Sequence, residues 1–125
     1  MHAAEELVKI VHLDDAALTP VSDLSYGQQR QLEIAMALSG APRFILFDEP
    51  AAGLSPTERR ELVEILTGLP SHVGYIIIEH DMDVALRVSE NVTMMHNGRI
   101  FKEGKPAEIE DDPEVQALYL GGGDE

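Results

Sequence analysis

The sequence predicts an α/β fold in which a mostly parallel sheet is flanked by helices. Two short and largely apolar segments, 44–47 and 73–79, are typical of strands buried on both faces of a parallel sheet. Amphipathic or helix-like segments, 56–66 and 82–89, follow each of them. Alternation of strand and helix along the chain is typical of the parallel α/β class.

The part of the chain before the first strand is predicted to be helical. Residues 3–12 form a short helix, and the segment 14–23 is a loop that contains Pro20. Ser25 is an N-cap candidate for a second helix that ends near Ser39. This helix is apolar on nearly every side, so we expect it to be deeply buried.

The end of the chain is predicted to contain a hairpin and a short helix. Strands at 92–95 and 99–102 flank an Asn-Gly pair at 97–98, which is the strongest short hairpin signal. A helix at 113–120 follows, and we expect residues 121–125 to fray.

The composition is that of a globular protein with a large excess of acidic residues. The 125 residues are 44% hydrophobic and 26% charged, which is enough chain to bury a core. The formal net charge of −14 opposes binding to a nucleic-acid backbone or to anionic lipid, so no nucleic-acid partner is expected. The absence of cysteine excludes a disulfide framework and a thiolate metal site.

The sequence shows no signal for membrane insertion. No apolar stretch approaches the roughly 18 residues that a membrane span needs. The N-terminus also lacks a secretory signal pattern. We therefore expect a soluble protein that serves a membrane process only by docking onto another subunit.

The first candidate site residues open the predicted helix that ends near Ser39. A helix N-terminus offers unpaired N–H groups and a partial positive charge, which suit an anion. Ser25 adds a hydroxyl group, and Gly27 lets the backbone approach a ligand closely. The alternative is a plain helix cap, which the local pattern by itself favours.

Two carboxylates, Asp48 and Glu49, end the first predicted strand. The carboxyl ends of parallel strands are where α/β proteins place ligands. One carboxylate can hold a magnesium ion through water, and the other can orient or deprotonate an attacking water. The alternative is an acidic cap on the helix 56–66 or a solvated turn.

Polar residues also follow the second predicted strand, at what we expect to be the same edge of the sheet. His80 suits contact with a terminal phosphate oxygen or the attacking water, and the alternative is a helix cap or a surface group. Glu79, His80 and Asp81 have poor spacing for a metal triad, because neighbouring side chains point in different directions. The other four histidines lack such a context and are interpreted as surface residues. They are His2, His12, His72 and His96.

Taken in this order, the motifs resemble the ATP-binding-cassette family over almost all of the chain from Asp23 onward. The segment 44–48 resembles the family's Walker B strand. The resemblance implies that Asp48 holds magnesium through water. It also implies that Glu49 is the catalytic glutamate and that His80 is the switch histidine.

The resemblance extends to two further motifs. The segment 24–28 resembles the signature, which in the family covers the ATP held by a partner subunit; its implied ATP-binding residues are Ser25, Tyr26, Gly27 and Gln28. The segment 52–55 falls at the D-loop, which here consists of Ala52, Gly53, Leu54 and Ser55. Tyr26 replaces the glycine of most members, and Ser55 replaces the aspartate of many members, which bears on communication across a dimer.

Within the family, the resemblance is greatest to the ATP-binding subunits of branched-chain amino acid importers. The segments that carry it are 24–35, 48–54, 79–83, 104–109 and 119–121. The implied partners are a second ATP-binding subunit, in a homo- or heterodimer, and the transmembrane permease subunits. The implied location is cytoplasmic, at the inner face of the cell membrane. The alternatives are a lipopolysaccharide-export ATPase, a soluble non-transport cassette protein and a non-enzymatic interaction module of the same fold.

The resemblance also implies a division of the chain and an absence. Residues 1–40 correspond to part of the helical subdomain with the signature helix, and residues 41–125 to the C-terminal part of the catalytic core. The sequence contains no phosphate-binding G-x-x-x-x-G-K-[ST] loop, because its one Gly-Lys pair, Gly104-Lys105, is followed by Pro106. We therefore expect a partial P-loop NTPase fold without the Walker A strand and loop. ATP and magnesium serve the intact family, and neither is expected to be bound to this chain alone.

The missing strand has a consequence for the sheet. In related P-loop proteins, the strand that feeds the phosphate loop lies between the switch-histidine strand and the strand after it. Here this leaves a gap between 73–79 and 92–95, and unpaired edges of buried strands are sticky. We expect the chain to close the gap by rearranging, by pairing with a second copy or by binding its missing half.

Overall fold

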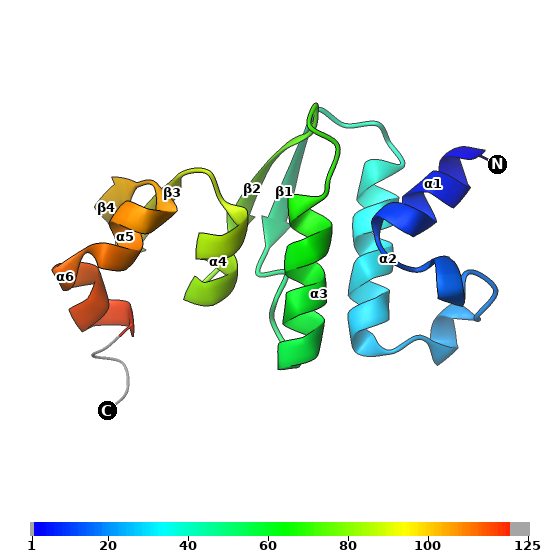
Figure 1. The fold of residues 1–125 in the computed structure, drawn as a ribbon, viewed down its shortest axis with the longest axis horizontal. Coiled ribbons are helices and arrows are strands. Elements are labelled where there is room, and N and C mark those ends of the chain that lie inside the picture. Colours follow the sequence, from blue (N-terminus) through cyan, green and yellow to red (C-terminus); the bar gives the residue numbers. More distant parts are fainter. Residues whose placement is uncertain (1, 121–125) are drawn as a thin grey trace. The chain divides into compact units, whose positions relative to one another are not determined.

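The computed structural model describes residues 2–120 and divides into two compact units, 1–78 and 79–125, each of which is described by itself. No helix in the described part of the chain is long and apolar enough to span a membrane. The first unit contains three helices and two strands (Figure 1). They are α1 (His2–Ile10), α2 (Tyr26–Leu38), β1 (Phe44–Asp48), α3 (Pro56–Thr67) and β2 (Gly74–Ile78).

The predicted loop before α2 folds into two short 3₁₀ turns. They span Asp14–Ala16 and Val21–Asp23. The chain then enters α2 at Ser25, as predicted.

Strands β1 and β2 pair in parallel, and α3 connects them as the crossover helix. The register begins with Phe44 opposite Gly74 and ends with Asp48 opposite Ile78. A Cβ atom at Gly74 would lie 2.5 Å from the Phe44 ring, so a larger residue there would displace this exposed ring. The predicted α/β class with a parallel sheet is confirmed.

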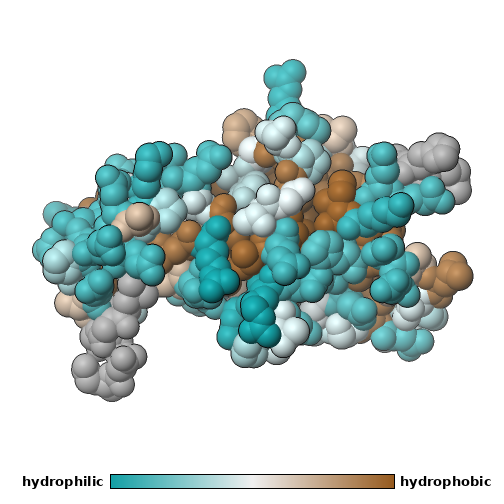
Figure 2. Space-filling view, in the orientation of Figure 1, coloured by the Kyte–Doolittle hydropathy of each residue, from teal (hydrophilic) through white to brown (hydrophobic). Residues whose placement is uncertain are grey.

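Helix α3 covers one face of this pair of strands. Its residues Ile65 and Leu66 are fully buried, and Ile45 and Phe47 are the buried side chains of β1. The Tyr75 hydroxyl donates a hydrogen bond to the Leu66 carbonyl, 3.2 Å away, and the Tyr75 ring meets the Phe47 ring edge-on at 6.0 Å. Apolar burial and one side-chain hydrogen bond therefore fix α3 on the sheet. Figure 2 shows hydrophilic side chains over the visible side of α3.

The prediction that both strands are buried on both faces is wrong. Side chains alternate between two faces along a strand, and the second face of β1–β2 is bare. Its apolar residues are 52% to 73% exposed; they are Phe44, Leu46, Ile76 and Ile78. The elements of the first unit supply helices to one face only.

The prediction of deep burial for α2 is also wrong in part. Ile34, Ala35 and Leu38 are buried, but Met36 is exposed. The helix packs along one stripe, because α1 and the α3–sheet layer cover only that side of it.

The second unit is built on the predicted hairpin. Strands β3 (Val92–His96) and β4 (Arg99–Gly104) are antiparallel, with a bulge at residues 94–95. Both turn residues, Asn97 and Gly98, have positive φ angles of 53° and 76°, as a tight hairpin turn requires. The hairpin prediction is confirmed.

Short helices surround the hairpin of the second unit. They are α4 (Met82–Val88), α5 (Pro106–Asp111), α6 (Pro113–Val115) and a π-helical turn (Gln116–Leu120). Helix α5 was not predicted, although Pro106 at its start is a typical first helical residue. The predicted helix 113–120 is split between α6 and the π-helical turn. The expected fraying of 121–125 lies outside the described residues, and the division at residue 40 stays a prediction.

The core of the second unit is a small apolar cluster with an ionic border. Met94, Ile109 and Val115 are its buried members. The Lys102 ammonium lies 2.7 Å from the Glu114 carboxylate and 3.4 Å from that of Asp112. These two contacts raise the pKa of Lys102, the Glu114 hydrogen bond most of all.

The Asp112 carboxylate caps α6. Burial acts to raise the pKa of Asp112, but the N–H donors of Val115 and Glu114 and the Lys102 ammonium outweigh it, so the net pKa is lowered. The charged form is therefore favoured in the folded state. Its contribution to stability is present above the unfolded pKa of about 3.9 and is lost as the pH falls through the lower folded value.

A neighbouring pair of substitutions tests the bare face of the sheet. We expect Ile45→Ala, at a side chain 8% exposed, to lower the free energy of unfolding by about 2–5 kcal/mol. Leu46→Ala, at a side chain 67% exposed, should cost less than about 1 kcal/mol. Urea denaturation of the purified chain measures both. Equal losses would show that something covers Leu46 in solution.

A carboxyl NMR titration tests the Asp112 cap. We expect Asp112 to titrate below the ordinary aspartate range, and Lys102→Met to move its pKa upward, because one of the groups that favour its charged form is removed. Glu103→Gln is the control, since Glu103 contacts Thr93 and not Asp112. An unchanged Asp112 titration in Lys102→Met would contradict the assigned contact.

Candidate functional site

The carboxylates Asp48 and Glu49 lie at the carboxyl edge of the β1–β2 pair. Asp48 is the exposed last residue of β1. Glu49 has a left-handed backbone with φ of 50°, which is uncommon outside glycine and concentrates at functional sites. Its N–H donates to the Ile78 carbonyl at 2.6 Å, and its own carbonyl accepts from the Ala52 N–H at 3.1 Å. The main chain therefore holds Glu49 at the end of both strands.

The cap of α3 is Ser55. The Glu58 N–H donates to the Ser55 hydroxyl at 3.2 Å, and the Ser55 N–H donates to the Glu58 carboxylate at 2.9 Å. This reciprocal pair is a capping box. The alternative that Asp48 or Glu49 caps this helix is therefore wrong.

The predicted D-loop residues form the tight turn before this cap. Leu54 is buried, Ala52 is exposed and Gly53 has a φ of 78°. The Arg59 guanidinium donates to the Leu54 carbonyl at 2.6 Å. The start of α3 thus fixes the turn from its carboxyl side.

The predicted signature residues open α2. The Gln28 N–H donates to the Ser25 hydroxyl at 3.1 Å, and the Ser25 N–H donates to the Gln28 side-chain oxygen at 3.0 Å. Ser25 is thus a true helix cap, which was the simpler alternative. Among the described residues, the N–H groups of Tyr26 and Gly27 have no hydrogen-bond partner. They remain available to an anion.

Gly27 packs closely against the Glu58 side chain. A Cβ atom at this position would lie 2.6 Å from the Glu58 carboxylate oxygen. The predicted reason for Gly27 was close approach to a ligand, whereas the structure shows close approach of α3. The Glu58 carboxylate repels anions on the side of Gly27 that faces α3. An anion must therefore approach the N–H groups of Tyr26 and Gly27 from a side that does not face Glu58.

The structure brings the predicted signature and D-loop segments close together, which the motifs did not predict. A Cβ atom on Gly53 would lie 3.1 Å from the Tyr26 ring. The Arg30 guanidinium lies 5.4 Å from the centre of the same ring, in a cation–π contact. The four-residue spacing of Tyr26 and Arg30 on one helix face was the available signal.

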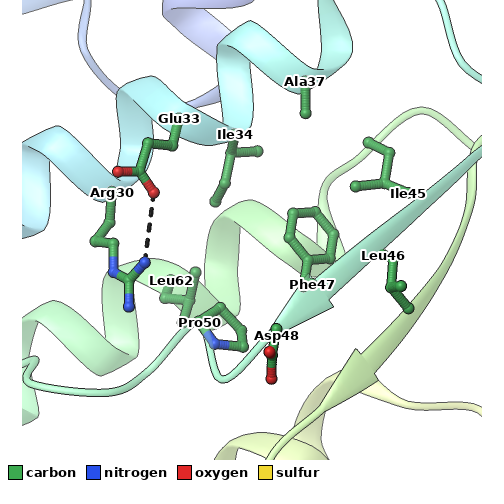
Figure 3. Close-up of a pocket in the computed structure, with 10 residues that line it drawn as sticks. All are labelled: Arg30, Glu33, Ile34, Ala37, Ile45, Leu46, Phe47, Asp48, Pro50 and Leu62. Atoms are coloured by element: carbon green, nitrogen blue, oxygen red, sulfur yellow. Dashed lines mark hydrogen bonds and ion pairs between the residues drawn. The ribbon is translucent and has the colours of Figure 1, made fainter.

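Arg30 is a site residue that sequence reasoning missed. It reaches from α2 to the Glu49 carbonyl at 3.5 Å and to the Glu33 carboxylate at 3.4 Å. Its Nε atom is buried and has no hydrogen-bond partner within the part of the chain described. Arg30 borders a cavity of about 290 Å³ at the end of β1 (Figure 3). The other lining residues are Glu33, Ile34, Ala37, Ile45, Leu46, Phe47, Asp48, Pro50 and Leu62.

His80 belongs to the second unit. The cap of α4 is Asp81, whose carboxylate accepts from the Val84 N–H at 3.2 Å, so the alternative that His80 is the cap is wrong. The Glu79 carboxylate accepts from the N–H groups of His80 and Asp81, at 3.1 and 3.2 Å. His80 is exposed, and its role toward the carboxylates of the first unit stays a prediction.

Three of the four histidines predicted at the surface are exposed. They are His12, His72 and His96. The side chain of His2 lies outside the described residues. His12 contacts Glu61, which the sequence did not indicate.

Two family models match the ends of the chain. The model described as ABC transporter matches residues 1–52. The model described as branched-chain amino acid ATP-binding cassette transporter matches residues 103–125.

Curated relatives match nearly the whole chain. The branched-chain amino acid transport ATP-binding protein BraF of Pseudomonas aeruginosa is 37% identical over 97% of this chain and 48% of its own length. The lipopolysaccharide export ATP-binding protein LptB of Acidithiobacillus ferridurans is 38% identical over 94% of this chain and 49% of its own length. LivG of Salmonella typhimurium is another branched-chain amino acid transport ATP-binding protein. It is 40% identical over 80% of this chain and 40% of its own length. The chain spans about half the length of the curated relatives it matches.

Solved structures share the fold. The ATP-binding cassette MJ1267 in its ADP conformation superposes with a TM-score of 0.79 at 29% identity, over 96% of this chain and 49% of that one. The cbiO1 protein of Clostridium perfringens superposes with a TM-score of 0.80 at 29% identity, over 95% of this chain and 49% of that one. Together these matches show that the chain is similar to ATP-binding-cassette transporter proteins, with curated relatives that serve branched-chain amino acid transport or lipopolysaccharide export.

Proposed function

We propose that this chain supplies the hydrolytic part of an ATP-binding subunit that drives branched-chain amino acid import. The observation that carries the proposal is the Asp48–Glu49 pair at the carboxyl edge of β1, with Glu49 held in a left-handed conformation by the main chain. The branched-chain match at residues 103–125 supports the transported class.

The carboxylate chemistry of the edge fits a magnesium nucleotide. An exposed aspartate at this position can hold magnesium through water, and Asp48 is the residue we assign to it. Bound MgATP would supply the γ-phosphate that is attacked. Glu49 orients or deprotonates the attacking water. The role proposed for His80, which lies in the second unit, is contact with a terminal phosphate oxygen.

The start of α2 fits the phosphate of a second subunit. The unpaired N–H groups of Tyr26 and Gly27, the Ser25 hydroxyl and the Gln28 side chain are the donors that we assign to it. Ser25 and Gln28 keep each other in place through the capping box. The Tyr26–Gly53 contact links this surface to the D-loop within one chain.

Activity requires parts that this sequence does not contain. A phosphate-binding loop supplies most of the grip on a nucleotide, and no such motif occurs in the 125 residues. The proposed assembly therefore includes a polypeptide that supplies this loop, a second ATP-binding subunit and the permease subunits. Its place is the cytoplasmic face of the cell membrane.

One other transport role has specific support. The match to LptB favours lipopolysaccharide export as the second candidate, because the identity is as high as that to BraF. The branched-chain match at residues 103–125 favours the importer. A non-enzymatic module of the same fold is the third candidate, and the Glu49 variant below separates it from both transport roles.

The chain alone should not bind MgATP with micromolar affinity, because the amide cradle and lysine of the phosphate loop are missing. Isothermal titration calorimetry of the purified 125-residue chain measures this. Full-length BraF is the positive control. A micromolar dissociation constant for the chain would contradict the prediction.

The Glu49 assignment is tested after co-expression with a polypeptide that supplies the phosphate-binding loop. We expect Glu49→Gln to lower the ATP hydrolysis rate by about 10²- to 10⁴-fold, because the group that activates water is lost. Nucleotide binding should persist, since Glu49 is not assigned to grip phosphate. Glu90→Gln, at an exposed glutamate of the second unit, should leave the rate unchanged. Equal rates for the wild type and Glu49→Gln would sink the catalytic assignment.

A further inference from the structure

We propose that His12, Glu61 and Glu64 form a binding site for a divalent transition-metal ion, with Zn²⁺ as the representative ion. His12 lies just after α1, and the two glutamates lie three residues apart on α3. One ligand atom from each side chain lies within 4.8 Å of the other two. All three residues belong to the first unit, and none is used by the proposed ATP site.

The three side chains project from a backbone that is fixed by burial. His12 stands between Val11 and Leu13, which are both buried. The N–H of His12 donates to the Lys9 carbonyl at 3.0 Å, and the N–H of Leu13 donates to the Val8 carbonyl at 2.8 Å. The imidazole is therefore presented toward α3 by a turn that cannot shift without exposing core residues.

Buried neighbours also fix the backbone at the two glutamates on α3. Glu61 precedes the buried Leu62, and Glu64 precedes the fully buried Ile65. Their carboxylates thus emerge at the border of the core, one helical turn apart. A site whose ligands are held in place binds more tightly, because less conformational entropy is lost.

The charges of the group favour a cation. Two carboxylates three residues apart on a helix repel each other. Among the residues that the structure describes, the Glu61 carboxylate has one ion pair, with the His12 Nδ1 atom. Glu64 has no ion pair there. Glu58, one turn earlier, differs because its carboxylate is occupied by the Ser55 N–H.

The donor set points to a transition metal. One imidazole nitrogen and two carboxylate oxygens are typical zinc ligands, whereas Mg²⁺ and Ca²⁺ select oxygen alone. Tetrahedral bonds of about 2.0–2.2 Å place ligand atoms about 3.4 Å apart, so side-chain rotations must draw the three groups together from within 4.8 Å. A bound ion would replace the direct His12–Glu61 contact and leave one position for water. It would also tie the end of α1 to α3.

Calorimetric titration of the full 125-residue chain with ZnCl₂ tests the site. We expect one saturable Zn²⁺ per chain, and no competition from a tenfold excess of Mg²⁺. His12→Asn and Glu64→Gln should each weaken binding by at least about tenfold. Asparagine is chosen because His12 has a φ of 62°, which asparagine tolerates.

Matched controls separate this site from general attraction to an acidic protein. His72→Asn and Glu6→Gln remove an exposed histidine and an exposed glutamate elsewhere in the first unit, and should leave Zn²⁺ binding unchanged. Circular dichroism of each variant checks that the fold is kept, and Glu64→Gln is the least disruptive change because its side chain is exposed. The proposal is overturned by the absence of saturable binding, by equal loss in the control variants, or by Mg²⁺ competing as well as Zn²⁺.

Discussion

The parallel pairing of β1 with β2 is the constraint on which the first unit depends. The register that places Asp48 opposite Ile78 sets the position of Glu49, because its N–H is bound to the Ile78 carbonyl. The same pairing fixes which side chains face α3 and which face outward. A shift of one residue would exchange the two faces, turning Ile45 and Phe47 away from α3. The candidate site is thus an outcome of strand register as much as of motif.

Helix α3 joins the core to the candidate site. Its buried residues hold the sheet, and its first turn caps itself through Ser55 and Glu58. A Cβ atom at position 27 would meet the Glu58 side chain, so the second residue of α2 lies close to α3. Arg30 completes the connection by reaching from α2 to the Glu49 carbonyl. These three contacts relate the start of α2, the start of α3 and the end of β1 within a single unit.

The second face of the β1–β2 pair exposes apolar side chains. Unbroken apolar runs are typical of parallel strands covered on both faces, and both strands of this sheet contain such runs. The elements of the first unit cover one face, and β2 has no strand partner besides β1 in the described structure. This agrees with a chain that spans about half the length of its relatives.

The sequence by itself determined the α/β class, the hairpin turn and the placement of two acidic residues after an apolar strand. These depend on local patterns such as an Asn-Gly turn or two acids after an apolar run, which act within a few residues. Only the tertiary structure decided the one-sided burial of β1, the role of Arg30 and the meeting of His12 with Glu61. Each of those joins residues that are distant in sequence. Such contacts depend on how α1, α2 and α3 pack, and no local pattern encodes that packing.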